Sequence, residues 1–162
     1  MTVLTGANAA DGQIDFDGHI KANTCKINDD KPNFTVDLPH VSMNAFSQAS
    51  PTTGRTPFQL NLTECTPETG SVYTYFEPGP TVNPLTGRLI VDAGGAQNVE
   101  VGLLNDRHGP IDASKAAGSQ NSQLVAVSGG NATLDYFAEY AATGAVTPGL
   151  VKTRVQYTLI FP

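Results

Sequence analysis

The last stretch of this 162-residue chain is the feature that most restricts its fold. From residue 151 to residue 161, apolar or β-branched side chains occupy every odd position, whereas most even positions are charged or polar. Side chains alternate between the two faces of a β-strand, so this pattern predicts a long strand with one buried face. We expect a long strand to pair on both sides, and no sequence follows Pro162 to supply another neighbour. The pattern therefore predicts a sheet from which a strand is missing.

The rest of the chain also favours an all-β sandwich. Charged residues make up only 15% of the chain, below the average of about 25%, and 16 glycines and 11 prolines provide many turns. Short alternating or β-branched runs, each bounded by turn residues, predict strands. These runs are residues 13–20, 34–38, 57–62, 72–76, 88–91, 99–104, 124–127, 132–140 and 150–161. A helix is expected only as a single turn within residues 111–118.

The N-terminus divides into two parts. Residues 1–11 are small and polar and predict a detachable arm, which precedes a domain of residues 12–162. Ile14, Phe16, Gly18 and Ile20 then share one face of an alternating run, which predicts the first strand of the domain.

Charge and hydropathy exclude two classes of partner. The net charge of −6 repels phosphate backbones and anionic bilayers, so we expect no nucleic acid partner. No apolar run reaches the roughly 20 residues that cross a bilayer, so we expect no membrane insertion.

Two cysteines leave two alternatives open. Cys25 and Cys65 have no CxxC spacing and no histidine at zinc-ligand spacing. We expect one structural disulfide between them, which requires an oxidising compartment; two buried free thiols are the alternative.

No chemical site emerges from the remaining residues. His19, His40 and His108 are far apart in the sequence, and no serine lies in a GxSxG motif. We therefore expect no metal, no cofactor and no enzymatic activity.

An ordered set of motifs resembles a known family. The matching positions are Gly12, Ile14, Phe16, Gly18, Ile20, Cys25, Lys26, Ile27, residues 36–41, Phe46, Gly54, Thr56, Pro57, Phe58, Leu60, Leu62, Cys65, Asn98, Val99, Val101, Leu103, Tyr136, Ala138, Tyr140, residues 142–144, Gly149 and Phe161. In this order and with this cysteine spacing, the chain resembles the chaperone-usher pilins of the type 1 fimbrial major subunit family. Phe161 departs from the family, which usually has tyrosine at this position.

The resemblance implies an immunoglobulin-like β-sandwich that lacks its C-terminal strand. A donor strand from a neighbouring subunit or a chaperone would complete it, which is a recognised form of β-strand addition. The implied function is a structural subunit of a bacterial fimbria that supports cell adhesion. The implied partners are identical or related pilin subunits, a periplasmic chaperone and an outer-membrane usher, and the implied location is the cell surface.

Particular residues follow from this resemblance. We expect the donor strand within residues 1–11, with Val3, Leu4 and Gly6 at the groove; which face of the arm enters stays open. The expected acceptor groove is formed by Ile14, Phe16, Val151, Val155, Tyr157, Leu159 and Phe161.

Two other functions compete with a shaft subunit. The first is a tip adaptor or adhesin that binds a host receptor, although tip adhesins generally carry a further N-terminal domain. The second is a secreted immunoglobulin-like domain unrelated to pili, which would contain all of its own strands.

Overall fold

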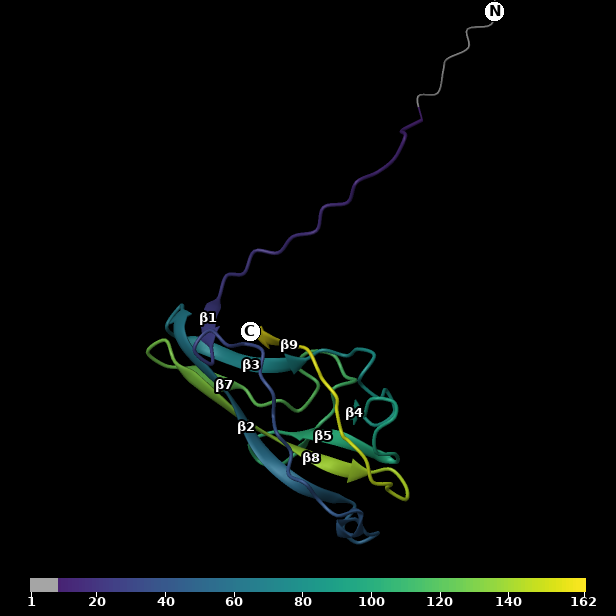
Figure 1. Cartoon of the computed structure of the whole chain (residues 1–162). Helices are drawn as coiled ribbons and strands as arrows, with labels where there is room; N and C mark the ends of the chain where they lie inside the picture. The colour runs from purple at the N-terminus through teal and green to yellow at the C-terminus, as the bar shows by residue number, and fades with distance from the viewer. Residues whose placement is uncertain (1–8) are drawn as a thin grey trace, which may run out of the picture.

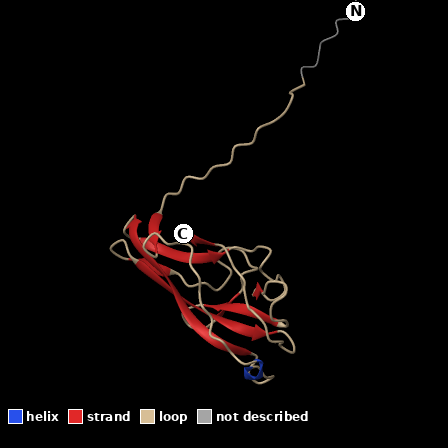
Figure 2. Cartoon of the chain, viewed as in Figure 1, coloured by secondary structure: helices blue, strands red, loops and turns tan. Residues whose placement is uncertain are grey.

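In a computed structural model, residues 9–162 are described, and they fold into two antiparallel β-sheets (Figures 1 and 2). The strands are β1 (Thr24–Ile27), β2 (Thr52–Thr66), β3 (Gly70–Phe76), β4 (Leu89–Ile90), β5 (Val99–Leu104), β6 (Pro110–Ile111), β7 (Val125–Val127), β8 (Ala132–Ala142) and β9 (Tyr157–Ile160). The helical element of this part of the chain is one 3-10 turn, Met43–Ala45.

The larger sheet has the strand order β1-β2-β8-β5-β4, with β6 paired to β5. Its centre is the long pair of β2 and β8, which runs from Thr52 opposite Ala141 to Leu62 opposite Ala132 with a register shift between Thr53 and Thr56. The smaller sheet has the order β7-β3-β9. All of these pairs are antiparallel, including β2 with β8 and β3 with β9, which are far apart in the sequence.

Aromatic side chains join the two sheets. The ring of Tyr136 on β8 meets Phe76 on β3 edge to face, with ring centroids 5.3 Å apart, and stacks on Phe58 of β2 at 5.6 Å. Leu60 and Leu134 are fully buried beside them. The alternation of buried and exposed residues along β2 and β8 thus places one face of the larger sheet in a shared core. This arrangement confirms the expected all-β sandwich.

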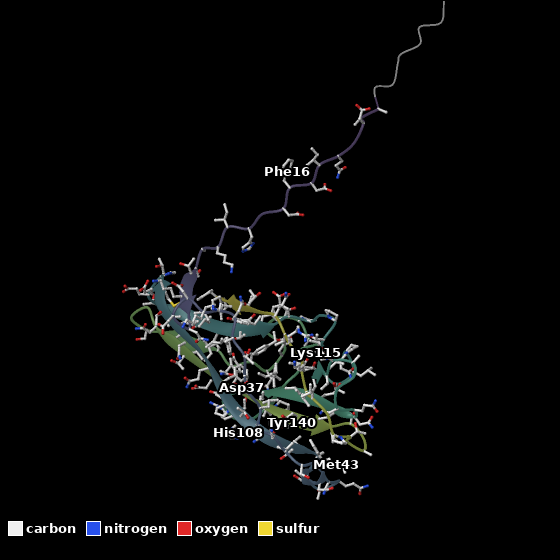
Figure 3. All side chains as sticks on the ribbon, in the orientation of Figure 1. Phe16, Asp37, Met43, His108, Lys115 and Tyr140 are labelled. Atoms are coloured by element: carbon white, nitrogen blue, oxygen red, sulfur yellow. A yellow bond between two sulfur atoms is a disulfide. The ribbon has the colours of Figure 1, made fainter. Side chains whose placement is uncertain are left out.

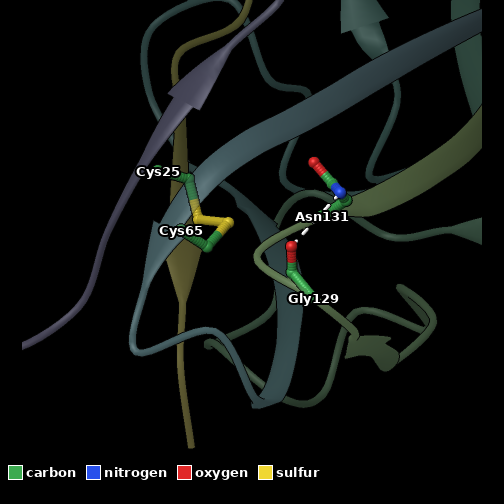
Figure 4. Close-up of a disulfide and its surroundings, with 4 residues drawn as sticks. All are labelled: Cys25, Cys65, Gly129 and Asn131. Atoms are coloured by element: carbon green, nitrogen blue, oxygen red, sulfur yellow. Dashed lines mark hydrogen bonds between the residues drawn. A yellow bond between two sulfur atoms is a disulfide. The ribbon is translucent and has the colours of Figure 1, made fainter.

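The predicted disulfide is also confirmed (Figure 4). Cys25 on β1 is bonded to Cys65 near the end of β2, across the strand pair that places Thr24 opposite Thr66. The bond closes a loop with a sequence separation of 40 and fixes the edge strand β1 to the sheet.

Four predicted elements differ from the structure. Residues 13–20 and 34–38 are extended but pair with no strand, and within residues 150–161 only β9 is paired. The alternation of side chains in these three segments predicts an extended backbone, but it does not specify whether a partner strand is available. Residues 111–118 form turns rather than a helical turn. There the buried Gln120 amide binds the backbone of Phe76 and the carbonyl of Lys115, and so takes the place of a neighbouring strand.

Candidate functional site

An apolar groove opens between two extended segments of the sandwich. Its volume is about 1280 Å³. We call residues 33–41 the N-terminal wall and residues 149–157 the C-terminal wall. In Figure 1 the first descends from β1, and the second rises in yellow toward β9. The floor consists of core side chains from both sheets, namely Leu60, Phe76, Leu89, Val101, Leu103 and Ala138. These floor side chains are buried, so the groove reaches down to the packed core of the sandwich.

The C-terminal wall is hydrogen-bonded along its outer edge. The carbonyls of Leu150, Lys152 and Gln156 accept hydrogen bonds from the backbone N–H groups of Ala96, Asp92 and Glu77 at 2.8–2.9 Å. These carbonyls belong to even-numbered residues, so the backbone groups of the odd-numbered residues face the groove.

The groove-facing edge of this wall is unpaired. Val151, Thr153 and Val155 make no backbone hydrogen bond to any other described residue. Buried backbone groups are almost always paired, and an open strand edge readily pairs with another strand. This edge is thus suited to accept a strand.

The N-terminal wall has a similar unpaired backbone. Within the described part of the chain, residues 33–41 make no backbone-to-backbone hydrogen bond. Val36 and Leu38 are half-buried and line the groove, while Asp37 between them is exposed. Two extended segments with apolar inner faces therefore lie on either side of the groove.

Two tyrosines hold the N-terminal wall in place. The hydroxyl of Tyr157 donates to the carbonyl of Pro32 at 2.6 Å and so connects the two walls at one end of the groove. The hydroxyl of Tyr140 donates to the carbonyl of Pro39 at 2.9 Å and ties the wall to β8. Burial raises the pKa of both tyrosines, which keeps them protonated as donors.

A charge pair holds the C-terminal wall against its neighbour. The guanidinium of Arg154 donates two hydrogen bonds to the carboxylate of Asp92, one of them at 2.9 Å. These hydrogen bonds hold the pKa of Asp92 below its usual value. The pair fixes the outer edge of the wall and leaves the inner edge free.

The predicted acceptor residues fall into three groups. Val151, Val155 and Tyr157 line the groove, and their role as acceptors of a strand stays a prediction. Leu159 and Phe161 pack against the core beyond the groove and do not line it.

The structure does not place Ile14 and Phe16 in the groove wall. They are 78% and 89% exposed on an extended arm, residues 9–23, that projects away from the domain (Figure 3). The physical reason is that residues 13–20 pair with no strand of their own chain. The expected donor residues Val3, Leu4 and Gly6 lie outside the described residues.

Sequence reasoning missed the N-terminal wall. The run at residues 34–38 was predicted as a strand, but its role beside the groove was not. Its signal was the same alternation, with Val36 and Leu38 on one face. The position of this wall opposite residues 149–157 depends on the tertiary structure.

The described residues offer no competing chemical site. No group of three or more His, Cys, Asp or Glu side chains among them is placed to hold a metal ion. His108 instead packs edge to face on Phe137, with ring centroids 4.4 Å apart. None of the helical structure in residues 9–162 is long and apolar enough to cross a membrane.

Comparisons with known proteins decide the family. The family model described as "FimA: Type-1 fimbrial protein, A" matches residues 38–162. The chain belongs to the type-1 fimbrial proteins. It is 48% identical to the "Major fimbrial subunit SMF-1" of Stenotrophomonas maltophilia (strain K279a), over 96% of this chain and 95% of that protein. It is 40% identical to the "F17 fimbrial protein" of Escherichia coli, over 94% of this chain and 88% of that protein.

A solved structure supports the fold. One subunit of a chaperone-usher pilus superposes with a TM-score of 0.63, over 99% of both chains and at 19% identity. As a type-1 fimbrial protein, the chain is a structural fimbrial subunit, of a family whose members are assembled into fimbriae on the cell surface. This confirms the predicted family, function and location. The family is one of structural subunits rather than of enzymes.

Proposed function

We propose that the open groove is filled by residues 12–20 of another copy of this chain, and that repetition of this step builds the fimbria. The observation that carries the proposal is the exposure of Ile14, Phe16 and Ile20, at 78%, 89% and 97%, on one face of an unpaired strand. The same chain thus presents an apolar strand without a sheet and an apolar groove without a strand. The strand would supply a hydrogen-bonding partner for the unpaired edge of the groove, and the groove would bury the apolar face of the strand.

The lengths of strand and groove agree. Nine extended residues at about 3.3 Å each span about 30 Å, and this holds for both residues 12–20 and the C-terminal wall. The incoming backbone would meet the unpaired edge at Val151, Thr153 and Val155. Its apolar face would pack on the floor of the groove.

The position of the arm favours a filament over a closed dimer. The arm leaves the domain at the end where β1 and the C-terminus lie, whereas the turn into the C-terminal wall lies at the opposite end (Figure 1). A donor that runs antiparallel to the C-terminal wall enters with its own domain below the acceptor. Copies are then related head to tail, and such a contact repeats without closing.

The donor segment and the domain boundary then lie later in the chain than the sequence pattern predicts. We place the end of the arm at residue 23 and the start of the folded domain at β1, rather than dividing the chain between residues 11 and 12. The physical reason is that β1 is the first segment that pairs with the sheet and carries the disulfide to Cys65.

Before assembly, the open groove needs a temporary cover. We propose that a periplasmic chaperone lends a strand to it and that an outer-membrane usher exchanges this strand for the arm. A shaft subunit fits better than a tip adaptor or adhesin, because the chain has its own arm and its 48% identical relative is a major fimbrial subunit.

The test uses the full, oxidised chain and a synthetic peptide of residues 11–21. We expect excess peptide to keep the chain monomeric in size-exclusion chromatography and to raise its melting temperature markedly. A peptide with serine at Ile14, Phe16 and Ile20 is the matched control and should do neither. A chain that stays monomeric alone and ignores both peptides would overturn the proposal.

A further inference from the structure

The outer face of the C-terminal wall carries two cations. Lys152 and Arg154 are exposed and alternate along this wall with the half-buried Val151, Thr153 and Val155, so their side chains lie on its solvent face. Arg154 is engaged with Asp92, whereas Lys152 forms no ion pair with any other described residue. A strand that pairs with this wall would place its own outer side chains beside these two cations.

The arm carries two anions in the matching place. When Ile14 and Phe16 face the groove, Asp15 and Asp17 face outward, because side chains alternate along a strand. Acidic positions on the incoming strand thus face basic positions on the accepting strand, although the chain as a whole has a net charge of −6.

We infer that these charges set the register of the incoming strand, with Asp15 opposite Arg154 and Asp17 opposite Lys152. The inference rests on the proposed function, since it concerns the arm of a second copy in the same groove. It identifies Lys152 as a specificity-determining residue, because this cation forms no ion pair within the described part of the chain.

The backbone geometry brings these side chains close together. In the C-terminal wall the even-numbered residues direct their carbonyls to the outer edge, so Lys152 and Arg154 occupy non-hydrogen-bonded positions toward the groove. Opposed side chains approach most closely at such positions of an antiparallel pair. Opposite charges there stabilise the pair, and like charges destabilise it.

Side-chain size favours the same register and direction. With these charge pairs, Gly12 lies opposite Tyr157, where the tyrosine hydroxyl already bonds to Pro32 and little space is left. Ile20 then lies beside Gly149, which lines the groove without a side chain. A parallel strand would have to exchange the partners, with Asp15 opposite Lys152 and Asp17 opposite Arg154, and would place Ile20 against Tyr157.

The other wall contributes one opposing charge. Asp37 is exposed there (Figure 3), and in this arrangement it lies on the same outer face as Asp17. It repels the incoming carboxylates, which leaves Lys152 as the neighbouring free cation that favours them. Removal of the lysine charge should therefore have a measurable effect.

The first test is a double-mutant cycle between the full chain and the labelled peptide of residues 11–21. Lys152→Glu in the chain, or Asp17→Lys in the peptide, should each weaken binding about two- to fivefold, and the combination should restore most of the loss. Lys115→Glu is the matched control, because this exposed lysine lies outside the groove and the change in net charge is the same.

The outcomes separate this inference from the proposed function. If no peptide binds the unaltered chain, the proposed function fails. If the unaltered peptide binds, either of two results would refute the charge register. In the first, Asp17→Lys weakens peptide binding equally for the unaltered chain and the Lys152→Glu chain. In the second, Lys152→Glu changes the affinity for the peptide no more than Lys115→Glu does.

A second test reads the register directly. An Asp17→Cys peptide should form a disulfide with the Lys152→Cys chain faster than with the Leu150→Cys or Gln156→Cys chain, because opposed non-hydrogen-bonded positions suit a disulfide best. Faster cross-linking at position 150 or 156 would overturn the register.

Discussion

Replacement of Phe16 by alanine separates two roles for the arm, a strand of the chain's own core and a strand offered to a neighbour. The Phe16 side chain is 89% exposed in the isolated chain. Truncation of an exposed side chain changes stability by less than about 0.5 kcal/mol. The free energy of unfolding of the isolated subunit should therefore stay nearly constant.

The effect on assembly should be large. A phenylalanine that enters the groove becomes core, and truncation of a core phenylalanine to alanine costs about 3–5 kcal/mol. Because the groove can relax around a smaller side chain, we take the lower limit of about 3 kcal/mol, which corresponds to a loss of affinity of about a hundredfold. The perturbation therefore acts almost entirely on the contact between copies.

The assay compares peptides of residues 11–21 with phenylalanine or alanine at position 16, binding to the full chain. The chain contains no tryptophan, so the peptide carries a fluorescent label and binding is followed by anisotropy. Gln13→Ala is the matched control, since this residue lies on the outer face of the same arm. Unfolding of the Phe16→Ala chain is followed by circular dichroism in denaturant.

One result would refute this reasoning. If Phe16→Ala lowers the stability of the isolated subunit by several kcal/mol and leaves peptide binding unchanged, Phe16 belongs to the chain's own core. The arm would then be the first strand of the domain, as its sequence pattern alone predicts.

Three further predictions concern the subunit itself. Replacement of Cys25 and Cys65 by serine should lower the free energy of unfolding by about 4 kcal/mol, from the loop-closure entropy for a separation of 40, measured by denaturant titration. Val155→Asp should abolish peptide binding because it places a charge in the groove, while circular dichroism still shows the β-sandwich; unchanged binding would contradict the assigned wall. The hydrogen bonds from Arg154 lower the pKa of Asp92, so the stability from this pair is present above the usual aspartate pKa and is lost as the pH falls through the lowered value. Arg154→Gln should remove this loss of melting temperature at acidic pH. If the melting temperature of the variant falls with pH as it does in the unaltered chain, the pair does not contribute in this way.

Much of the fold could be predicted from the sequence because the pattern of each strand is local. The alternation along residues 57–62 and 132–140 places their apolar side chains on one face, and the structure buries those faces in β2 and β8. The choice of a disulfide over free thiols needed the structure, which brings Cys25 and Cys65 together on paired strands.

The candidate site was predicted only in part. Val151, Val155 and Tyr157 line the groove as their odd positions imply, whereas Leu159 and Phe161 lie past its end. The end of the groove is set by the point at which β9 begins to pair with β3, and this pairing joins residues far apart in the chain. No local pattern shows where such pairing starts.

The sequence by itself determined which face of each segment is apolar, including the face of the arm that carries Ile14 and Phe16. Only the tertiary structure decided which sheet each apolar face belongs to. The physical reason is that a period of two specifies the orientation of side chains but not the partner of the backbone. In this chain the backbone hydrogen bonds of the sandwich begin at β1, so the apolar face before it stays exposed, and the groove between residues 33–41 and 149–157 stays open.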